Sequence, residues 1–340
     1  MKEWLKKALP WIKATIWLLV ILGVGYQFWK ILHAEALLSA DKNRSPESIL
    51  WEQFTSIPLK NLLISSILYI LGIGLSACYW HILLRLQGGK LSLANSARCY
   101  YLSQLGKYVP GKGLALFLRV STSMESSVPA STAAIAAVYE VMVTMASGSL
   151  LALILGFYVS MGSEQLIGIL FLLAVSLTPV LPFIFPKVVT KLARRFLNQS
   201  ESPSKIANWS SLFTGLTMTG AGWFFLGCSL FVLWHGVDST TLKGLPRSIL
   251  ECTSMVTIAN VGGFVASTPG GLGVREFLLK LFLEPHLGTK VVATVLSLRL
   301  LWTLSEVVTA CILFWLRPKT GIRESLDTAA NIPKDHPSAT

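Results

Sequence analysis

Apolar residues run through this chain in long blocks, separated by short segments that hold most of its charged residues. A block of about 20 apolar residues is long enough for an α-helix to cross the hydrocarbon core of a bilayer. The blocks lack the short alternating segments that are typical of membrane β-strands. The pattern therefore predicts six membrane-spanning helices, at Trp11–Leu32, Leu62–Leu86, Ser131–Ser160, Leu166–Val188, Leu212–Trp234 and Lys290–Leu316.

The first and fourth blocks each need a qualification. Trp11–Leu32 follows three lysines, as a signal peptide would, but it is longer than a signal h-region and is not followed by a small-x-small cleavage site. We interpret it as a retained membrane helix. The fourth block is punctuated by Pro179, Pro182 and Pro186, which predict a kinked or early-ending helix because proline cannot continue the backbone hydrogen bonding.

Two further stretches, Leu91–Pro129 and Leu245–Leu287, are long enough to enter the membrane, turn and leave it. Their centres are too polar and too rich in glycine and proline for one lipid-facing helix. Broken backbone is tolerated at membrane depth only where protein or a wet cavity surrounds it. We therefore expect two re-entrant helical hairpins that enter from opposite faces, an inverted arrangement typical of transporters.

The two expected hairpins share a local motif, "YVPGKGLALFLR" at Tyr108–Arg119 and "STPGGLGVREF" at Ser267–Phe277. Proline ends a helix and glycine adopts backbone angles that other residues avoid. The half-helix that begins after such a break exposes free N–H groups, which favour phosphate or carboxylate. The alternative is a tight turn between packed helices. The candidate turn residues are Pro110, Gly111 and Gly113 in the first motif and Pro269, Gly270, Gly271 and Gly273 in the second.

Composition supports a membrane protein, since 53% of the 340 residues are hydrophobic and only 14% are charged, against about 25% charged in soluble domains. The fold class expected is therefore an all-α polytopic membrane bundle. We expect one transmembrane domain over residues 11–317, with a short N-terminal segment at 1–10 and a disordered polar tail at 318–340. The five scattered cysteines form no CxxC pair and no zinc-type spacing, so we expect buried thiols, no metal and no cofactor.

The formal net charge of +12 could indicate nucleic acid in a soluble protein. Here the basic residues gather at the ends of apolar blocks, as the positive-inside rule and anionic lipids favour, so we expect no nucleic-acid partner. The basic segment Lys187–Lys205 and the basic flanks of both termini fit together if all three are cytoplasmic. This predicts a multi-pass protein of the plasma membrane, the inner membrane in a bacterium, with both termini in the cytoplasm.

Several charged residues fall inside the apolar stretches, where a lone charge costs at least about 2.5 kcal/mol. Arg299 and Glu306 lie seven positions apart, on one face of the last block. We expect Glu140 to pair with an arginine from one of the hairpins. These charges are either structural ion pairs or a path for a charged headgroup. Arginine matches phosphate oxygens two at a time. The charged candidates for headgroup binding are Lys107, Arg119, Glu140, Arg275, Glu276, Arg299 and Glu306.

The quoted motifs, together with "VYEVMV" around Glu140, resemble the lysylphosphatidylglycerol synthase transmembrane, or flippase-like, family over roughly residues 10–318. The stretch "TPGGLGVRE" is close to the family signature PGGLGxxE. The resemblance implies a multi-pass fold with broken helices whose best understood members move aminoacylated phosphatidylglycerol between leaflets. Carried over by position, it points to Pro110, Gly111, Arg119, Glu140, Pro269, Gly270, Gly271, Gly273 and Glu276. Lys112 departs from the small or apolar residue more usual in the first motif.

The first interpretation is a lipid translocator that acts on a phospholipid or aminoacylated phospholipid headgroup. A second is an accessory subunit or enzyme of envelope glycolipid or polyprenyl-phosphate assembly, and a third is an ion-coupled transporter of a small solute. No nucleophile–base arrangement or phosphate-binding loop is present in the sequence, so we expect no catalysis. The expected partners are membrane phospholipids, with a second copy of the chain or a lipid-biosynthesis enzyme as further possibilities.

Overall fold

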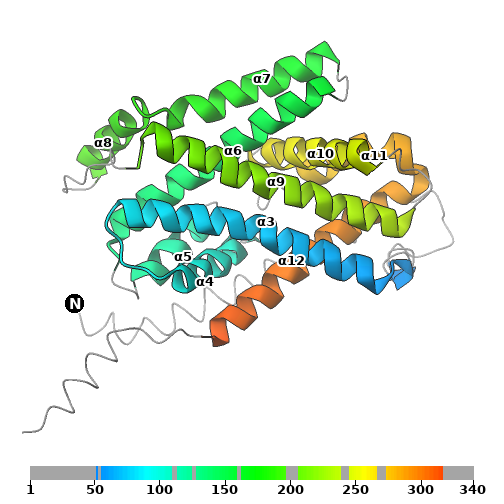
Figure 1. Ribbon diagram of the computed structural model, residues 1–340, viewed down its shortest axis with the longest axis horizontal. Helices are drawn as coiled ribbons and strands as arrows, with labels where there is room; N and C mark the ends of the chain where they lie inside the picture. Colours follow the sequence, from blue (N-terminus) through cyan, green and yellow to red (C-terminus); the bar gives the residue numbers. More distant parts are fainter. Residues whose placement is uncertain are drawn as a thin grey trace, which may run out of the picture.

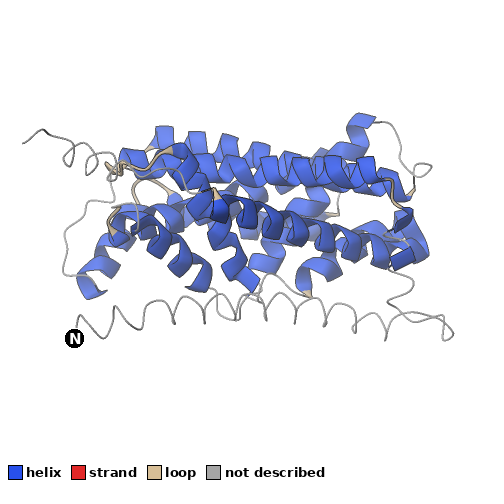
Figure 2. Ribbon diagram, turned by 90° about the horizontal axis from the view of Figure 1, so that it is seen from below, coloured by secondary structure: helices blue, strands red, loops and turns tan. Residues whose placement is uncertain are grey.

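The computed structural model describes residues 51–52, 55–108, 113–124, 128–158, 162–196, 206–238, 245–265 and 273–316. Within these ranges the chain folds into α-helices joined by loops and 3₁₀ turns, without a strand (Figure 2). This confirms the all-α fold class. The expected span Trp11–Leu32, the N-terminal segment and the tail lie outside the described residues.

Five of the described helices are long and apolar enough to cross a membrane, and a bent helix pair brings the number to six. Four agree with predicted spans: α3 (Leu59–Leu86), α6 (Ala130–Tyr158), α9 (Trp209–Val237) and α12 (Val291–Trp315). The fifth is α10 (Leu245–Val265), which was expected to be an arm of a broken hairpin. These helices form the body of the bundle (Figure 1).

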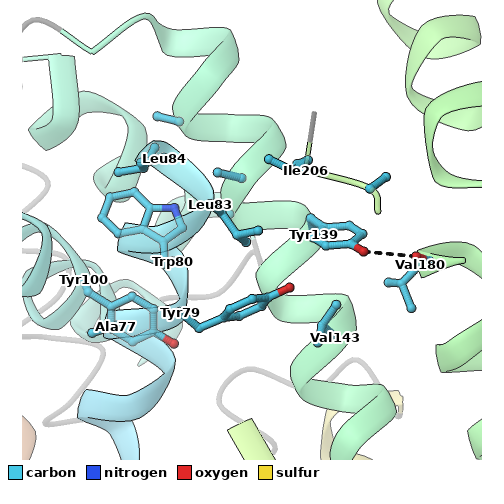
Figure 3. Close-up of a cluster of buried hydrophobic side chains, with 14 of the residues drawn as sticks. Ala77, Tyr79, Trp80, Leu83, Leu84, Tyr100, Tyr139, Val143, Val180 and Ile206 are labelled. Atoms are coloured by element: carbon cyan, nitrogen blue, oxygen red, sulfur yellow. Dashed lines mark hydrogen bonds between the residues drawn. The ribbon is translucent and has the colours of Figure 1, made fainter. Parts of the chain in front are cut away.

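The fourth predicted span ends early, as its prolines indicated. Helix α7 (Ser163–Leu177) stops at a 3₁₀ turn (Thr178–Val180), and α8 (Phe185–Phe196) then leaves at an angle of 66° to it. In α8 the apolar and basic residues fall on opposite sides of a helical wheel, a pattern typical of helices at a membrane interface. The buried Phe185 ring packs edge-on against Tyr139, at 4.6 Å between centroids. Figure 3 shows the Tyr139 hydroxyl directed at the Val180 carbonyl, 3.2 Å away.

Helices α3 and α9 lie side by side through the middle of the bundle (Figure 1). Small residues let their backbones approach closely, as is common between membrane helices. A Cβ added at Gly72 would lie 2.8 Å from the Gly222 carbonyl oxygen. The Ser65 and Ser229 hydroxyls, 2.8 Å apart, also bridge the two helices. This pair of helices is the scaffold against which the charged helices pack.

The first broken stretch folds as α4 (Leu93–Gln104), a 3₁₀ turn (Leu105–Tyr108) and α5 (Gly113–Met124). Neither arm is long enough to span a bilayer alone, in keeping with the predicted hairpin. The arms touch closely, since a Cβ on Gly106 would lie 2.7 Å from the Ala115 Cα. The second broken stretch has unequal arms, α10 and the 14-residue α11 (Val274–Leu287). The α4–α5 hairpin and α11 lie toward opposite ends of the bundle (Figure 1).

Candidate functional site

A buried ion pair joins the first hairpin to α6. The Arg119 Nη1 atom of α5 lies 2.7 Å from the Glu140 Oε2 atom of α6, and the two side chains are 6% and 1% exposed. The other Glu140 oxygen accepts hydrogen bonds from the Tyr100 hydroxyl at 2.9 Å and the Thr144 hydroxyl at 3.0 Å. The prediction that Glu140 pairs with a hairpin arginine is confirmed.

Arg119 is also enclosed by aromatic rings. Its guanidinium carbon lies 4.0 Å from the centroid of the Tyr100 ring and 5.6 Å from that of Trp80, and its Nε atom donates to the Ser103 hydroxyl at 3.1 Å. Both members of the ion pair are therefore well supplied with partners. This arrangement agrees with the interpretation that the pair holds the hairpin against the bundle.

Glu306 of α12 collects donors from the first hairpin and from α3. Its Oε1 atom accepts hydrogen bonds from the Lys107 ammonium and the Tyr69 hydroxyl. Its Oε2 atom accepts from the Tyr108 hydroxyl at 2.7 Å, and the same hydroxyl lies 3.0 Å from the Thr303 hydroxyl. The ammonium of Lys107 thus ties the turn between α4 and α5 to α12.

The N-terminus of α11 is shaped by a glycine and a glutamate. Gly273 has a φ of +85°, in the region that favours glycine. The Gly273 N–H donates to Glu276 Oε2 at 2.7 Å, so the glutamate caps its own helix. The other oxygen, Oε1, lies 3.5 Å from Arg299 Nε of α12 and has no hydrogen-bond partner among the described residues. Glu276 therefore links the second break to α12.

Arg275, next to Glu276, is 8% exposed. Its guanidinium carbon lies 4.8 Å from the centroid of the Trp302 ring, which in turn stacks on Tyr69 at 4.6 Å. The Trp302 Nε1 donates to the Ser229 hydroxyl at 2.9 Å, which fixes the ring. Among the residues that the structure describes, no hydrogen bond or ion pair to Arg275 is present. A buried guanidinium without an anionic partner is costly.

The charges within the described bundle are not balanced. Four cations face three carboxylates, which leaves one positive charge in excess: Lys107, Arg119, Arg275 and Arg299 against Glu140, Glu276 and Glu306. Arg119 is matched by Glu140, so the excess belongs to the group around α12. The arrangement can therefore hold one additional negative charge.

The structure places the seven charged residues that the sequence indicated in two groups, the Arg119–Glu140 pair and the five residues around α12. Arg299 and Glu306 each contact a different broken stretch, Arg299 through Glu276 and Glu306 through Lys107. Gly113 begins α5, and nothing lies within 4 Å of a Cβ placed on it, so packing does not demand glycine there. Gly273 caps α11 as described. The remaining turn candidates lie outside the described residues: Pro110, Gly111, Pro269, Gly270 and Gly271.

Sequence reasoning missed the aromatic and hydroxyl partners of these charges. Tyr69, Tyr100, Tyr108 and Trp302 each contact a buried charge, as described above. The tyrosines of the first hairpin stand near Lys107 in the sequence, and this proximity was the available signal. Within the described ranges, no group of three or more histidine, cysteine, aspartate or glutamate residues is placed to hold a metal ion.

Fold and site together define a helical, multi-pass membrane protein. Its charged cluster surrounds α12 and contacts α3 and the two broken stretches. Residues 48–313 match the family described as the lysylphosphatidylglycerol synthase TM region. The match covers well over half of the 340 residues, so the chain belongs to this family. Membership indicates an integral membrane protein with a lipid-related function. A comparison with curated proteins gave no match.

Proposed function

We propose that the protein binds a phospholipid headgroup at the cluster around α12 and moves the lipid between leaflets. One observation carries this proposal: Arg275 is buried beside Trp302 and has no anionic partner among the described residues. A phosphate group supplies both the missing charge and the acceptors for the planar guanidinium. Family membership supports a lipid as the source of that phosphate. The proposed role is binding and translocation, without a chemical step.

The position of the cluster suits a translocator. Its charged groups come from the turn of the first hairpin, the start of α11 and the middle of α12. Broken helices near the membrane midplane are where transporters commonly place their substrate sites. A headgroup received there can be approached along both broken stretches, since the α4–α5 hairpin and α11 lie toward opposite ends of the bundle (Figure 1).

Surface charge supports the proposed orientation. Among the described residues, the end of the bundle that holds the C-terminus of α3 and helix α8 carries basic side chains and no exposed acidic one. The basic residues with described side chains at this end are Arg85, Lys90, Arg98, Lys187 and Lys191. The opposite end carries Lys60, Arg247, Lys280 and Lys290 against Glu52, Glu164, Asp238, Glu251 and Glu284. By the positive-inside rule, the first end faces the cytoplasm of a plasma membrane.

The test uses the full-length protein in liposomes that contain phosphatidylglycerol with a fluorescent label on one acyl chain. An impermeant reductant added outside quenches only the outer leaflet, so quenching beyond that share measures translocation. Vesicles with wild-type protein are expected to show more quenching than protein-free vesicles. Vesicles with Arg275→Gln are expected to lose most of this additional quenching. Arg247→Gln is the matched control because this arginine is exposed and its ion pair within the described part of the chain is the one across a single turn to Glu251. Wild-type vesicles that quench no more than empty ones would overturn the proposal.

A further inference from the structure

Three carboxylates of the described bundle, the buried Glu140 and Glu306 and the partly buried Glu276, decide which headgroups fit the cluster, and this argument rests on the proposed function. A headgroup with an ammonium group, such as an aminoacyl or ethanolamine headgroup, needs a carboxylate with free acceptor capacity. The carboxylates of this bundle have little free acceptor capacity. Glu140 accepts from Arg119, Tyr100 and Thr144. It is also closed off from solvent, at 1% exposure.

Glu306 is equally occupied. It accepts from Lys107, Tyr69 and Tyr108, and its side chain is 1% exposed. An ammonium group entering here must displace Lys107, which already supplies the same charge from the same chain. The exchange gains no electrostatic energy and leaves the Lys107 ammonium without its carboxylate.

Glu276 keeps one open acceptor, Oε1, and this oxygen faces Arg299 Nε at 3.5 Å. An ammonium group bound there would lie beside the guanidinium of Arg299, and a second cation, Arg275, directly precedes Glu276 in the chain. Like charges at such separations repel by about 1 kcal/mol or more even in high dielectric, and by more where water is excluded. The open oxygen is therefore better placed to close on Arg299 than to receive a second cation.

The positively charged residues of the cluster, in contrast, can accept an anion. Arg275 is nine-tenths buried and has no partner among the described residues, and the cluster holds one positive charge in excess. We infer that the site takes a phosphate-bearing headgroup with net negative charge and no ammonium group. Two lipid sources share this chemistry, a glycerol phosphodiester such as phosphatidylglycerol and an isoprenyl phosphate. Lysylated phosphatidylglycerol and phosphatidylethanolamine fit less well, because the three carboxylates described above are already engaged and leave their ammonium group without a partner.

The test is equilibrium binding to purified full-length protein in neutral detergent, read by intrinsic tryptophan fluorescence. The probes are short-chain phosphatidylglycerol, lysylated phosphatidylglycerol and phosphatidylethanolamine with identical acyl chains, together with a short-chain isoprenyl phosphate. Wild type is expected to bind phosphatidylglycerol or the isoprenyl phosphate at least about tenfold more tightly than either amine lipid. The tighter of the two anionic probes identifies the source.

Variants separate the charge argument from general damage. Arg275→Gln is expected to lose the preference for anionic lipid, and Arg275→Lys to keep the preference with weaker binding, because lysine retains the charge but not the fork of donors. Arg247→Gln is the control. Glu276→Gln is expected to leave lysylated phosphatidylglycerol as weak as before, since no ammonium group uses that oxygen.

The inference is overturned if lysylated phosphatidylglycerol binds as tightly as phosphatidylglycerol, or if Glu276→Gln selectively abolishes its binding. It is also overturned if none of the four lipids binds. Its failure is distinct from failure of the proposed function. Equal binding and equal translocation of both lipids would leave the translocator standing without the preference. Selective binding without translocation would leave the preference standing without the translocator.

Discussion

Arg119 and Glu140, 21 positions apart, form a buried ion pair that fastens α5 to α6. Breaking such a pair from one side leaves an uncompensated charge and typically costs about 3–5 kcal/mol. Removing both charges costs much less, because no lone charge remains. The pair therefore offers a clean test of whether it is structural.

We expect Arg119→Met and Glu140→Leu each to lower the thermal unfolding midpoint of the detergent-solubilised protein markedly. The double variant is expected to recover most of that loss. The measurement is a thermal unfolding series with a double-variant cycle. Additive effects of the two substitutions would show that the residues do not act as a pair.

Replacing Arg275 is expected to change the thermal unfolding midpoint in the opposite direction. Its guanidinium is buried without a described partner, so replacing it with methionine removes the unfavourable desolvation of an unpaired charge. We expect Arg275→Met to raise the unfolding midpoint of the lipid-free protein while abolishing lipid translocation. Arg119→Met, matched in chemistry, should lower it. A lower midpoint for Arg275→Met would indicate that the guanidinium is structurally satisfied.

Packing between α9 and α10 gives a prediction that is independent of charge. A Cβ on Gly227 would lie 2.1 Å from the Thr253 Oγ1 atom and 2.5 Å from its Cα atom. Gly227→Ala should therefore destabilise the protein by about 1–3 kcal/mol through overpacking. Gly220→Ala, on the same helix with nothing within 4 Å of its Cβ, is the control and should be neutral or slightly stabilising. Equal unfolding midpoints for the two variants would contradict this account.

The proposed orientation is tested by cysteine labelling in a background without the five native cysteines. Lys191 of α8 and Glu164 at the start of α7 are both exposed and lie at opposite ends of the bundle. With an impermeant maleimide applied to spheroplasts, we expect Glu164→Cys to react directly. Lys191→Cys should react only after the membrane is permeabilised. The reverse pattern would invert the topology.

The spans were predictable because crossing a bilayer sets a length and an apolar composition that are visible locally. Helix α10 escaped this reasoning, since its polar residues made it resemble the arm of a broken hairpin. In the structure its threonines are satisfied internally: Thr253 donates to the Ile249 carbonyl and Thr257 to the Thr253 carbonyl. More than half of the residues in the most apolar part of this helix are also buried inside the bundle, so its polar residues need not face lipid.

The charged residues of the site were predictable because ionised groups are rare in membrane segments and mark functional or structural positions. The partners of these charged residues were harder to predict. The sequence indicated correctly that Glu140 would meet a hairpin arginine, but Glu306 pairs with Lys107, 199 positions away. Contacts over that separation depend on how helices stack, which local pattern does not encode. Tyrosine and tryptophan partners were hidden because aromatic residues also suit lipid-facing and interfacial positions.

Helix α12 binds the first hairpin through Glu306 and the second break through Arg299. Both residues sit on one face of a continuous helix, and a continuous helix moves as a stiff rod. A tilt that draws one of these side chains away from its partner must shift the other as well. The first hairpin and the start of α11 are thereby mechanically coupled through α12, so that a displacement of one is transmitted to the other.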